Sequence, residues 1–580
     1  MKERRLSIAI ATVIVLLVLF SSVVRAQTLT RGEFISSLYT ILGLPQPKTQ
    51  DPRSQAPILR LEVIKEAIKA LSYDDLLPFV SAENLPFPEV RELKKEDQKW
   101  VALAVTLNPP LFKGDIRGML NLNQPLTRQE FSYLKETLRT YAQGNISFYR
   151  EKKLHPNLTL ITKKRGFSSS LVPPLEPQGE QFFLQVGAYQ DETRAQRILS
   201  FLKELGYSAQ IQKENDLFKV RVGPYSKKEA KTVGERLKNQ GFSSYPVLEK
   251  GNGTRAQPFS GPVFILALLF DPRNAPFQIE VALANDQIMD REKTSEIARR
   301  NNAIFALNAS FFTKAGEPLG LLFANGRVLS EPIDGWYNCG FTAENEIFFG
   351  EMKFRAEAIL ENGTSHPVKG INRLNQGNEI VIYDPFFGPK TPAQKGVECI
   401  VRNGVVEQIR ESQGETSIPA QGFILQGNGK GAQWLLAHVT PGQKIQLKIG
   451  LYPLTGDITK WQKMQYAVSG GPLLFFEGNP GPFGQFNQDV VNKRHPRTVI
   501  GETKSGDILF LAVDGRRPGH SLGLTIQELV EELKNYHIKN ALNLDGGGST
   551  TFYLQGQILN IPADFTGERK ISTAILLKKK

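Results

Sequence analysis

The expected fold is decided by Ile508-Leu-Phe-Leu-Ala-Val513-Asp514-Gly515 and Ala541-Leu-Asn-Leu544-Asp545-Gly546-Gly547-Gly548. Each stretch is a short apolar run, which predicts a buried strand that ends in an aspartate. Between the two runs, a capping box that begins at Thr525 and an apolar pattern that ends at His537 predict one helix. A β-α-β unit of this kind has parallel strands and a right-handed crossover, so both aspartates are expected at one sheet edge.

Three consecutive glycines follow Asp545. Glycine permits positive φ and lets a ligand approach the backbone closely, and its amides can face an anion. An Asp-Gly pair is also common in ordinary turns, so each site taken alone is equally compatible with a plain turn. The pairing of two such sites favours a functional edge, because ligands of open α/β sheets bind beyond the carboxyl ends of strands.

Basic residues surround the two acids in the sequence. Lys493-Arg494-His495-Pro496-Arg497-Thr498 lies upstream, and Arg516, Arg517 and His520 follow Asp514. Guanidinium groups bind phosphate or carboxylate through paired hydrogen bonds. A further predicted strand, Ala303 to Leu307, ends at Asn308, whose side chain is expected at the same site.

Residues from about 260 to 580 resemble the phosphodiester glycosidase family. Six motifs occur in the family's order: Asn308-Ala-Ser-Phe-Phe312, Leu319-Gly320, Ser469-Gly-Gly-Pro472, Pro496-Arg-Thr498, Asp514-Gly515 and Asn543-Leu-Asp-Gly-Gly-Gly-Ser-Thr550. The resemblance implies hydrolysis of the bond between a sugar's anomeric carbon and a phosphodiester, as in N-acetylglucosamine-1-phosphodiesters. Such a leaving group is a weak base, so stabilising its charge matters more than protonating it.

The resulting hypothesis assigns Asp545 to the anomeric carbon or its water, Asp514 as the second carboxylate and His495 as an acid–base group. The predicted substrate-binding residues are Arg497, Thr498, Arg516, Arg517, Asn308, Ser469, Gly470, Gly546, Gly547, Ser549 and Thr550, with Glu568 and Arg569 closing over the site. No cofactor is predicted. The acidic loops leave a divalent cation such as calcium open, and the sequence has no zinc-like His/Cys spacing.

The chain has 580 residues and a net charge of +13. This length predicts three or four domains. Basic residues precede an apolar stretch from Leu6 to Val24, so residues 1–26 are expected to be a signal peptide or an N-terminal membrane anchor. For an exported chain the charge favours an anionic secondary wall polymer over nucleic acid, with simple solubility as the alternative. Cys339 and Cys399 are compatible with one disulfide or with two unpaired core thiols.

Residues 27–140 are expected to be helical. Helix starts are predicted at Thr30-Arg31-Gly-Glu33, at Leu59-Arg60-Leu-Glu62 and at Thr127-Arg128-Gln-Glu130. Together they resemble S-layer homology repeats, which bind secondary wall polymers. Ordinary N-caps with an acid in the first turn are the alternative. A linker is expected over residues 141–180.

Residues 181–248 contain an internal repeat, Val186-Gly-Ala-Tyr189 against Val222-Gly-Pro-Tyr225. The repeat predicts a duplicated β-α-β module and resembles the sporulation-related repeat, SPOR, whose members bind peptidoglycan glycan strands. The resemblance implies glycan contacts at Gln185 and Lys219, with Leu217 where several members carry tryptophan. A spacer and an RNA-binding sheet are the alternatives, and export argues against RNA. A second linker at residues 249–260 leads to the last domain, 261–580.

The combined expectation is a multidomain α+β protein. It comprises a helical S-layer-homology-like region, a βαββαβ ferredoxin-like SPOR domain and a C-terminal mixed α/β phosphodiester glycosidase domain. The implied function is that of an exported envelope hydrolase, secreted or membrane-anchored, that cleaves a sugar-1-phosphodiester bond in a wall or exopolysaccharide glycan and is targeted to peptidoglycan. Two alternatives stay open: a non-catalytic protein that binds peptidoglycan or phosphosugar, and a glycosidase acting on unphosphorylated glycan.

Overall fold

The structure is a computed structural model. It describes residues 28–47, 51–83, 85–115, 118–167, 182–204, 207, 209–214, 217–225, 227–239, 242, 244–248, 261–481 and 486–580. The chain forms two compact units, Met1–Val172 with Gly261–Lys580, and Pro173–Ser260. The predicted signal peptide or membrane anchor and the linker at 249–260 lie outside the described residues. In the part of the chain that is described, no helix has the length and apolar character needed to cross a membrane.

The main sheet of the first unit has eight strands, and every neighbouring pair is antiparallel. Their order is β1 (Ser147–His155), β2 (Leu158–Arg165), β7 (Val263–Phe270), β27 (Ile508–Val513), β26 (Arg497–Thr503), β28 (Ile538–Asn543), β24 (Leu473–Phe476) and β25 (Asn479–Pro480). The two aspartate strands, β27 and β28, are parallel to each other as predicted, and β26 lies between them and pairs antiparallel with both. Asp514 and Asp545 therefore follow strand ends at one edge of the sheet.

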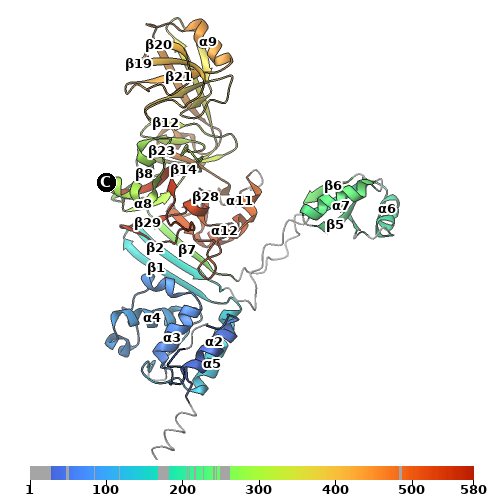
Figure 1. Ribbon diagram of the computed structural model, residues 1–580, viewed down its shortest axis with the longest axis vertical. Coiled ribbons are helices and arrows are strands. Elements are labelled where there is room, and N and C mark those ends of the chain that lie inside the picture. Colours follow the sequence, from blue (N-terminus) through green and yellow to red (C-terminus); the bar gives the residue numbers. More distant parts are fainter. Residues whose placement is uncertain are drawn as a thin grey trace, which may run out of the picture. The chain divides into compact units, whose positions relative to one another are not determined.

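The predicted linker at 141–180 is wrong for the residues of β1 and β2. These strands form a hairpin, and β2 pairs with β7 from Leu158↔Phe270 to Arg165↔Val263. Figure 1 shows the hairpin beside β7. The hairpin is partly exposed and partly buried, and it contains many lysines and arginines. These charged residues made the segment look like a linker in the sequence. The second unit is therefore inserted between two neighbouring strands of one sheet.

The amino-terminal region is helical, as predicted. It contains α2 (Arg31–Leu42), α3 (Arg60–Ala70), η1 (Asp74–Phe79), η2 (Pro88–Glu92), α4 (Lys95–Thr106) and α5 (Arg128–Ala142). Thr30, Leu59 and Thr127 are N-caps, each with the glutamate three residues later bonded back to it. The S-layer homology assignment itself stays a prediction.

The three helix starts at Thr30, Leu59 and Thr127 form a closed ring. Leu29 N donates to Leu126 O (2.9 Å), Leu126 N to Ile58 O (2.9 Å) and Ile58 N to Leu29 O (3.1 Å). The ion pairs close a second ring in the opposite sense, with Arg31 to Glu62, Arg60 to Glu130 and Arg128 to Glu33. This arrangement has an approximate threefold repeat.

A second sheet packs against the main sheet around a shared apolar core, with the rings of Phe305 and Phe510 5.0 Å apart. Its order is β30 (Gln557–Ile558), β29 (Phe552–Leu554), β10 (Phe305–Asn308), β32 (Thr573–Lys579) and β8 (Phe277–Leu283). Flanking elements are η3 (Ala284–Asp286), β9 (Glu292–Lys293), α8 (Thr294–Arg300), α11 (Gln488–Asn492), α12 (Ile526–Leu533), η4 (Lys534–Tyr536), η5 (Gly547–Ser549) and β31 (Lys570–Ile571). The capping box at Thr525 is present as predicted.

The middle of the chain adds three further sheets to the first unit. One is β12 (Arg327–Ser330), β11 (Leu322–Ala324), β23 (Met464–Gly470), β13 (Tyr337–Thr342) and β14 (Ile347–Gly350). The second is β16 (Ser365–Val368), β15 (Met352–Leu360) and β22 (Ile445–Pro453), and α10 (Ile458–Gln462) follows it. The third is β17 (Gly370–Ile371), β18 (Ile380–Tyr383), β21 (Gly422–Gly427), β19 (Gly396–Arg402) and β20 (Val405–Ser412), with α9 (Lys430–His438). Cys339 and Cys399 are buried free thiols on different sheets, and burial raises the pKa of Cys399 to about 12.

The second unit has the predicted βαββαβ order. Its elements are β3 (Phe182–Tyr189), α6 (Glu192–Glu204), β4 (Ala209–Glu214), β5 (Leu217–Tyr225), α7 (Lys227–Asn239) and β6 (Tyr245–Leu248), and the sheet order is β4-β5-β3-β6. Leu184, Val220 and Val222 form its core together with apolar side chains of both helices. Since strand side chains alternate, residues 185, 219 and 221 lie on the face of the sheet opposite the helices.

Candidate active site

Asp545 lies at the carboxyl end of β28, and backbone hydrogen bonds from two sides fix its position. Its N–H donates to Ala309 O (2.9 Å), and its carbonyl accepts from Asn308 Nδ2 (2.6 Å). On the other side of β28, Gly471 N donates to Asn543 O (2.7 Å). The strand ends of β10 and β28 therefore meet at this acid.

A buried network of polar side chains supports the loop that follows Asp545. Asn308 Oδ1 accepts from Thr498 Oγ1 (3.0 Å) and from Thr551 N (3.1 Å). Thr498 Oγ1 also lies 3.2 Å from Thr550 Oγ1. The predicted substrate residues Asn308, Thr498 and Thr550 are thus close together, but they are buried and hold the loop in place.

The glycines after Asp545 leave space for two arginines. A Cβ on Gly547, which has φ +63°, would lie 3.1 Å from Arg516 Nη2. A Cβ on Gly548 would lie 2.2 Å from Arg569 Nη2 and 2.1 Å from Asp564 Oδ1. Arg569 is held by paired bonds to Asp564 (2.7 and 2.9 Å), while Arg516 is exposed. Two guanidinium groups therefore border the loop of the half-buried Asp545.

Burial raises the pKa of the Asp545 carboxyl to about 6, despite the opposing effects of the Ser549 hydroxyl, the Gly546 amide and the charges of Arg569 and Arg516. Ser549 Oγ is buried and makes no hydrogen bond of regular geometry within the described residues, so it lies near the carboxyl without binding it firmly. A carboxyl with such a pKa is mostly ionised at neutral pH and can act as a nucleophile or base.

The structure does not support Asp514 as the second carboxylate of the site. Its side chain is 1% exposed, and both oxygens accept hydrogen bonds. Oδ1 bonds to Asn560 Nδ2 (2.9 Å), and Oδ2 bonds to Ile561 N (2.8 Å) and His520 Nε2 (2.7 Å). A carboxylate saturated in this way organises the fold and is not available to a sugar.

His520 connects Asp514 to the amino-terminal region, a role that the sequence did not reveal. Its Nδ1 bonds to Asp75, which also accepts from the buried Lys164 Nζ (2.5 Å). Burial lowers the pKa of His520, but hydrogen bonds to Asp514 and Asp75 and their charges outweigh this effect and raise it. The result is a buried chain of alternating charges between the helical region and the main sheet.

His495 has both ring nitrogens engaged, which argues against the predicted acid–base role. Nδ1 lies 3.0 Å from Arg516 Nη2, and Nε2 lies 3.2 Å from Asp489 O. Burial and the charges of Arg497 and Arg516 lower the pKa of His495, so the ring is neutral near pH 7. A neutral ring that accepts from Arg516 and donates to Asp489 orients the arginine.

Arg497 and Arg517 are largely committed to backbone carbonyls. Arg497 is 2% exposed and donates through Nε to Leu524 O (2.8 Å) and through Nη2 to Val490 O and Lys493 O (2.7 and 2.8 Å). Arg517 donates to Pro562 O (2.7 Å from Nη2). Among the arginines that the sequence assigned to substrate binding, Arg516 and Arg569 are therefore the two whose guanidinium groups donate to no backbone carbonyl within the described residues.

Three other predicted residues have structural roles. Ser469 Oγ donates to Asn338 Oδ1 (2.6 Å) and accepts from Leu321 N (2.6 Å). A Cβ on Gly470 would lie 2.5 Å from Asn543 O, so the strands approach closely there. Glu568 accepts from the N–H and hydroxyl of Ser295 (2.7 and 2.6 Å) and caps α8. Asp564, which the sequence did not single out, is the acid that orders Arg569.

In the second unit, Gln185 pairs with Arg221 across β3 and β5 on the face opposite the helices. Lys219 lies on the same face, as does Arg221, whose guanidinium donates to Gln212. The two predicted glycan-contact residues thus share one face of the sheet, but Gln185 is only 4% exposed and Arg221 only 5% exposed.

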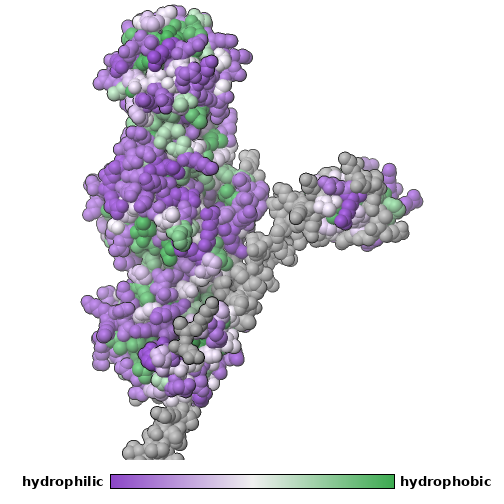
Figure 2. All heavy atoms as spheres, in the orientation of Figure 1, coloured by the Kyte–Doolittle hydropathy of each residue, from purple (hydrophilic) through white to green (hydrophobic). Residues whose placement is uncertain are grey.

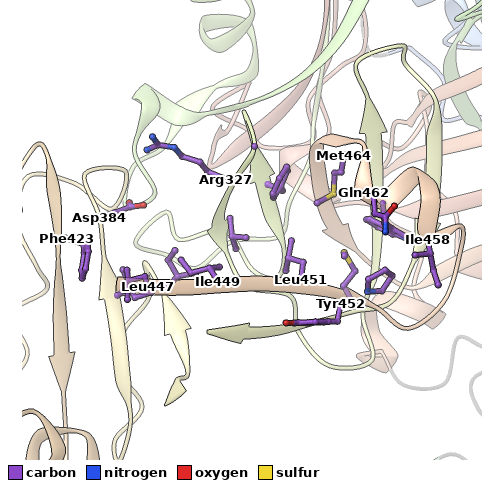
Figure 3. Close-up of a pocket in the computed structure, with 18 of the residues that line it drawn as sticks. Arg327, Asp384, Phe423, Leu447, Ile449, Leu451, Tyr452, Ile458, Gln462 and Met464 are labelled. Atoms are coloured by element: carbon purple, nitrogen blue, oxygen red, sulfur yellow. The ribbon is translucent and has the colours of Figure 1, made fainter. Parts of the chain in front are cut away.

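A cavity of about 680 Å³ lies away from these residues (Figure 3). It runs along β22 and is lined mainly by apolar side chains such as Leu447, Leu451 and Trp461, with Arg327 and Asp384 as charged groups. Figure 2 shows apolar side chains on the surface near β12, which borders the cavity. We favour Asp545 as the reactive site, because the cavity has no comparable cluster of reactive groups. Within the described part of the chain, no cluster of three or more His, Cys, Asp or Glu side chains is arranged to hold a metal ion.

Comparison with known proteins finds two domains in the chain. Residues 395–578 match the phosphodiester glycosidase family, and residues 178–248 match the SPOR domain family. The first match contains Asp514, Asp545 and the arginines around them, and the second coincides with the βαββαβ unit. The chain thus combines a glycosidase-type domain with a domain of the SPOR class.

The curated relatives in this comparison include N-acetylglucosamine-1-phosphodiester alpha-N-acetylglucosaminidase from Bos taurus, 36% identical over 98 residues, and from Homo sapiens, 34% identical over 101 residues. Each match covers 16% of this chain and only 18% of the length of the relative. A crystal structure of a protein from Burkholderia pseudomallei K96243, described as exported, covers 74% of this chain and 96% of that chain, with a TM-score of 0.53 and 22% identity. That likeness shows a shared fold.

Proposed function

We propose that this protein is a hydrolase of the cell envelope that cleaves a sugar-1-phosphodiester bond in a wall or exopolysaccharide glycan. The observation that carries the proposal is the half-buried Asp545, with a pKa raised to about 6, beside Arg516 and Arg569. The phosphodiester glycosidase match and the N-acetylglucosamine-1-phosphodiester relatives support the same substrate class.

In the proposed reaction, Asp545 either attacks the anomeric carbon and forms a glycosyl ester that water then hydrolyses, or takes a proton from the water that attacks this carbon. The bond between that carbon and the phosphate oxygen breaks, and the phosphate leaves with the electron pair. Arg516 and Arg569 stabilise the charge that develops on the phosphate oxygens. A weakly basic leaving group of this kind does not need to be protonated by a general acid. The site is therefore compatible with a His495 whose two ring nitrogens are both engaged in hydrogen bonds.

The remaining parts of the chain would hold the enzyme near its substrate. The SPOR match supports binding to peptidoglycan strands, for which Gln185 and Lys219, which share one face of the sheet, are the proposed contacts. The ring of helix starts at Thr30, Leu59 and Thr127 supports the proposed S-layer-homology-like role toward an anionic secondary wall polymer. Tethering of this kind raises the effective substrate concentration. The SPOR match and the exported description of the Burkholderia protein support the proposed envelope location, and secretion or membrane anchoring through residues 1–26 remains part of the proposal.

The test is hydrolysis of the methyl phosphodiester of N-acetylglucosamine 1-phosphate, with methyl N-acetylglucosaminide as the unphosphorylated control. The exported chain from residue 27 onward should be used, because a fragment that starts at residue 261 would lose β1 and β2 from the main sheet. We expect release of N-acetylglucosamine from the phosphodiester alone, with a loss of at least about 10³-fold in Asp545→Asn.

Asp271→Asn is a matched control, since Asp271 also follows a strand, β7, but β7 is antiparallel to β27 and its acid lies at the opposite sheet edge. It should retain full activity. Binding of the phosphodiester without release by the wild type would favour a non-catalytic binding protein. Release from the glycoside would favour a general glycosidase.

A further inference from the structure

Three aromatic side chains gather beside the strand end that carries Asp545. The ring centroids of Phe311 and Trp336 are 5.7 Å apart, and those of Trp336 and Phe486 are 5.1 Å apart. All three side chains are half-buried, so part of this aromatic cluster faces solvent. Binding of a phosphate group does not require partly exposed aromatic rings, so this cluster needs another explanation.

The backbone connects the cluster to the reactive acid. Trp336 precedes Tyr337, which pairs with Gly470 on β23. The next residue, Gly471, donates to the carbonyl of Asn543, two residues before Asp545. Phe311 follows Ala309, whose carbonyl accepts from the Asp545 N–H. Two backbone hydrogen bonds, at Asn543 O and at the Asp545 N–H, therefore link the segments next to Trp336 and Phe311 to the end of β28.

A glycine in one of the predicted motifs makes room for the ring of Phe486. A Cβ on Gly471 would lie 1.6 Å from Phe486 Cζ, a distance no side chain can tolerate. A Cβ on Gly320 would lie 3.6 Å from Trp336 Cε3 and 2.4 Å from the Ser469 side chain, and Gly320 has φ +84°. The position of Phe486 thus depends on a glycine of the Ser469-Gly-Gly-Pro472 motif, whereas Gly320 is required by the close approach of Ser469 and lies within ordinary contact distance of Trp336.

The aromatic and cationic groups flank β28 from opposite sides. In the main sheet β28 lies between β24 and β26. Gly471 and Phe486 belong to the segments around β24 and β25, whereas His495 precedes β26 and Arg516 follows β27. Asp545, at the end of β28, therefore separates an aromatic side of the site from a cationic side.

We infer that the aromatic cluster is the subsite for the sugar ring, with the ring stacked on Trp336 and the phosphate held by Arg516 and Arg569. This inference rests on the proposed function and specifies its substrate as a pyranosyl phosphodiester. The C–H face of a pyranose packs on the face of an aromatic ring, while the phosphate needs the guanidinium groups. A sugar phosphate bound across both sides places its anomeric carbon, which joins the two parts, at Asp545.

The test is calorimetric binding of N-acetylglucosamine 1-phosphate, glucose 1-phosphate and inorganic phosphate to the exported chain. Trp336→Ala should weaken both sugar phosphates about tenfold or more and leave inorganic phosphate unchanged. Arg516→Ala should weaken all three ligands. Trp336→Phe should retain most of the affinity but lose the change in tryptophan fluorescence that sugar binding produces. Trp434→Ala, a half-buried tryptophan of another sheet region, is the matched control and should change nothing.

The subsite is overturned if Trp336→Ala binds the sugar phosphates as tightly as the wild type, if it loses inorganic phosphate equally, or if the wild type binds no sugar phosphate. The proposed reaction fails separately, when the wild type shows the expected binding pattern but does not release sugar from the phosphodiester. If Trp336→Ala hydrolyses the phosphodiester at the wild-type rate with an unchanged KM, the proposed reaction is supported and the proposed sugar subsite is contradicted.

Discussion

Asp514 and Asp545 follow parallel strands at one edge of the same sheet, and each is followed by glycine, yet their surroundings are opposite. Asp514 is almost fully buried, with Asn560, Ile561 and His520 bonded to its two oxygens. Asp545 is half-buried, lies beside a hydroxyl that bonds it only loosely, and has a pKa raised to about 6. The number of hydrogen bonds that satisfy a carboxylate therefore separates a structural acid from a reactive one.

The comparison also shows why the amino-terminal region and the glycosidase-type domain form one unit. Asp514 is the inner end of a chain of charged groups that continues through His520 and Asp75 to Lys164. Lys164 is fully buried, and burial lowers its pKa although Asp75 opposes this. A buried chain of this kind is costly to interrupt, because each remaining group would be left without its partner.

The largest difference between the two acids is expected in stability, for the Asp514→Asn variant. This change removes the charge that faces His520 and should destabilise the first unit by about 3 kcal/mol. The midpoint of thermal unfolding at pH 7 should fall by several degrees, and Asp545→Asn is the matched control that should show no such fall. If the variant unfolds at the wild-type midpoint but no longer hydrolyses the phosphodiester, Asp514 takes part in the reaction.

Arg516 and Arg517 offer a second contrast, between neighbours with different partners. Arg516→Ala should reduce kcat/KM for the phosphodiester about 100-fold, or about 2.7 kcal/mol, because it removes charge stabilisation beside Asp545. Arg517→Ala should have a much smaller effect, since Arg517 donates to the carbonyl of Pro562. Equal losses in steady-state kinetics of the two variants would contradict the assignment of phosphate binding to Arg516.

The raised pKa of Asp545 predicts a pH-dependent gain in stability for Asp545→Asn. The folded state holds the proton of Asp545 up to about pH 6, whereas the unfolded chain releases it near pH 3.8. The wild type therefore loses stability as pH rises from about 4 to about 6 and stays at the lower value above that. The asparagine variant has no such titration, so it should be more stable than the wild type by about 1–2 kcal/mol at pH 7.5 and equal to it at pH 4.

Denaturant titrations at the two pH values measure this difference. In the variant, Arg569 and Arg516 lose the attraction of the nearby Asp545 charge, which reduces the gain. A variant that is less stable than the wild type at pH 7.5 would show that Asp545 stabilises the fold, and the contrast with Asp514 would be lost.

Much of this architecture was predictable from local patterns. The strand before Asp514, the capping box at Thr525, the helix starts and the βαββαβ unit all depend on residues close in sequence. The shared edge of the two acids also followed from the direction of their strands. Each of these signals lies within the element itself or within a few residues of its ends.

The errors arose where the partner was distant in sequence. His520 binds Asp75, 445 residues away, and so the saturation of Asp514 has no local signal. The hairpin of β1 and β2 joins β7 across the inserted second unit, so its place in the main sheet has no local signal either. Among the cations, the motif Pro496-Arg-Thr498 suggested Arg497, but only the fold shows that its guanidinium faces three carbonyls.

The smallest expected effect concerns His495, whose role distinguishes positioning from proton transfer. His495→Gln should lower kcat/KM less than about tenfold, because a glutamine amide oxygen can still accept from Arg516. The pH profile decides the matter. If His495 only orients Arg516, the variant keeps the rise in activity through pH 6 that follows ionisation of Asp545 and shows no other change in shape. If His495 transfers a proton, the replacement removes one limb of the profile, and the contrast between a single reactive carboxylate and its structural surroundings must be redrawn to include this ring.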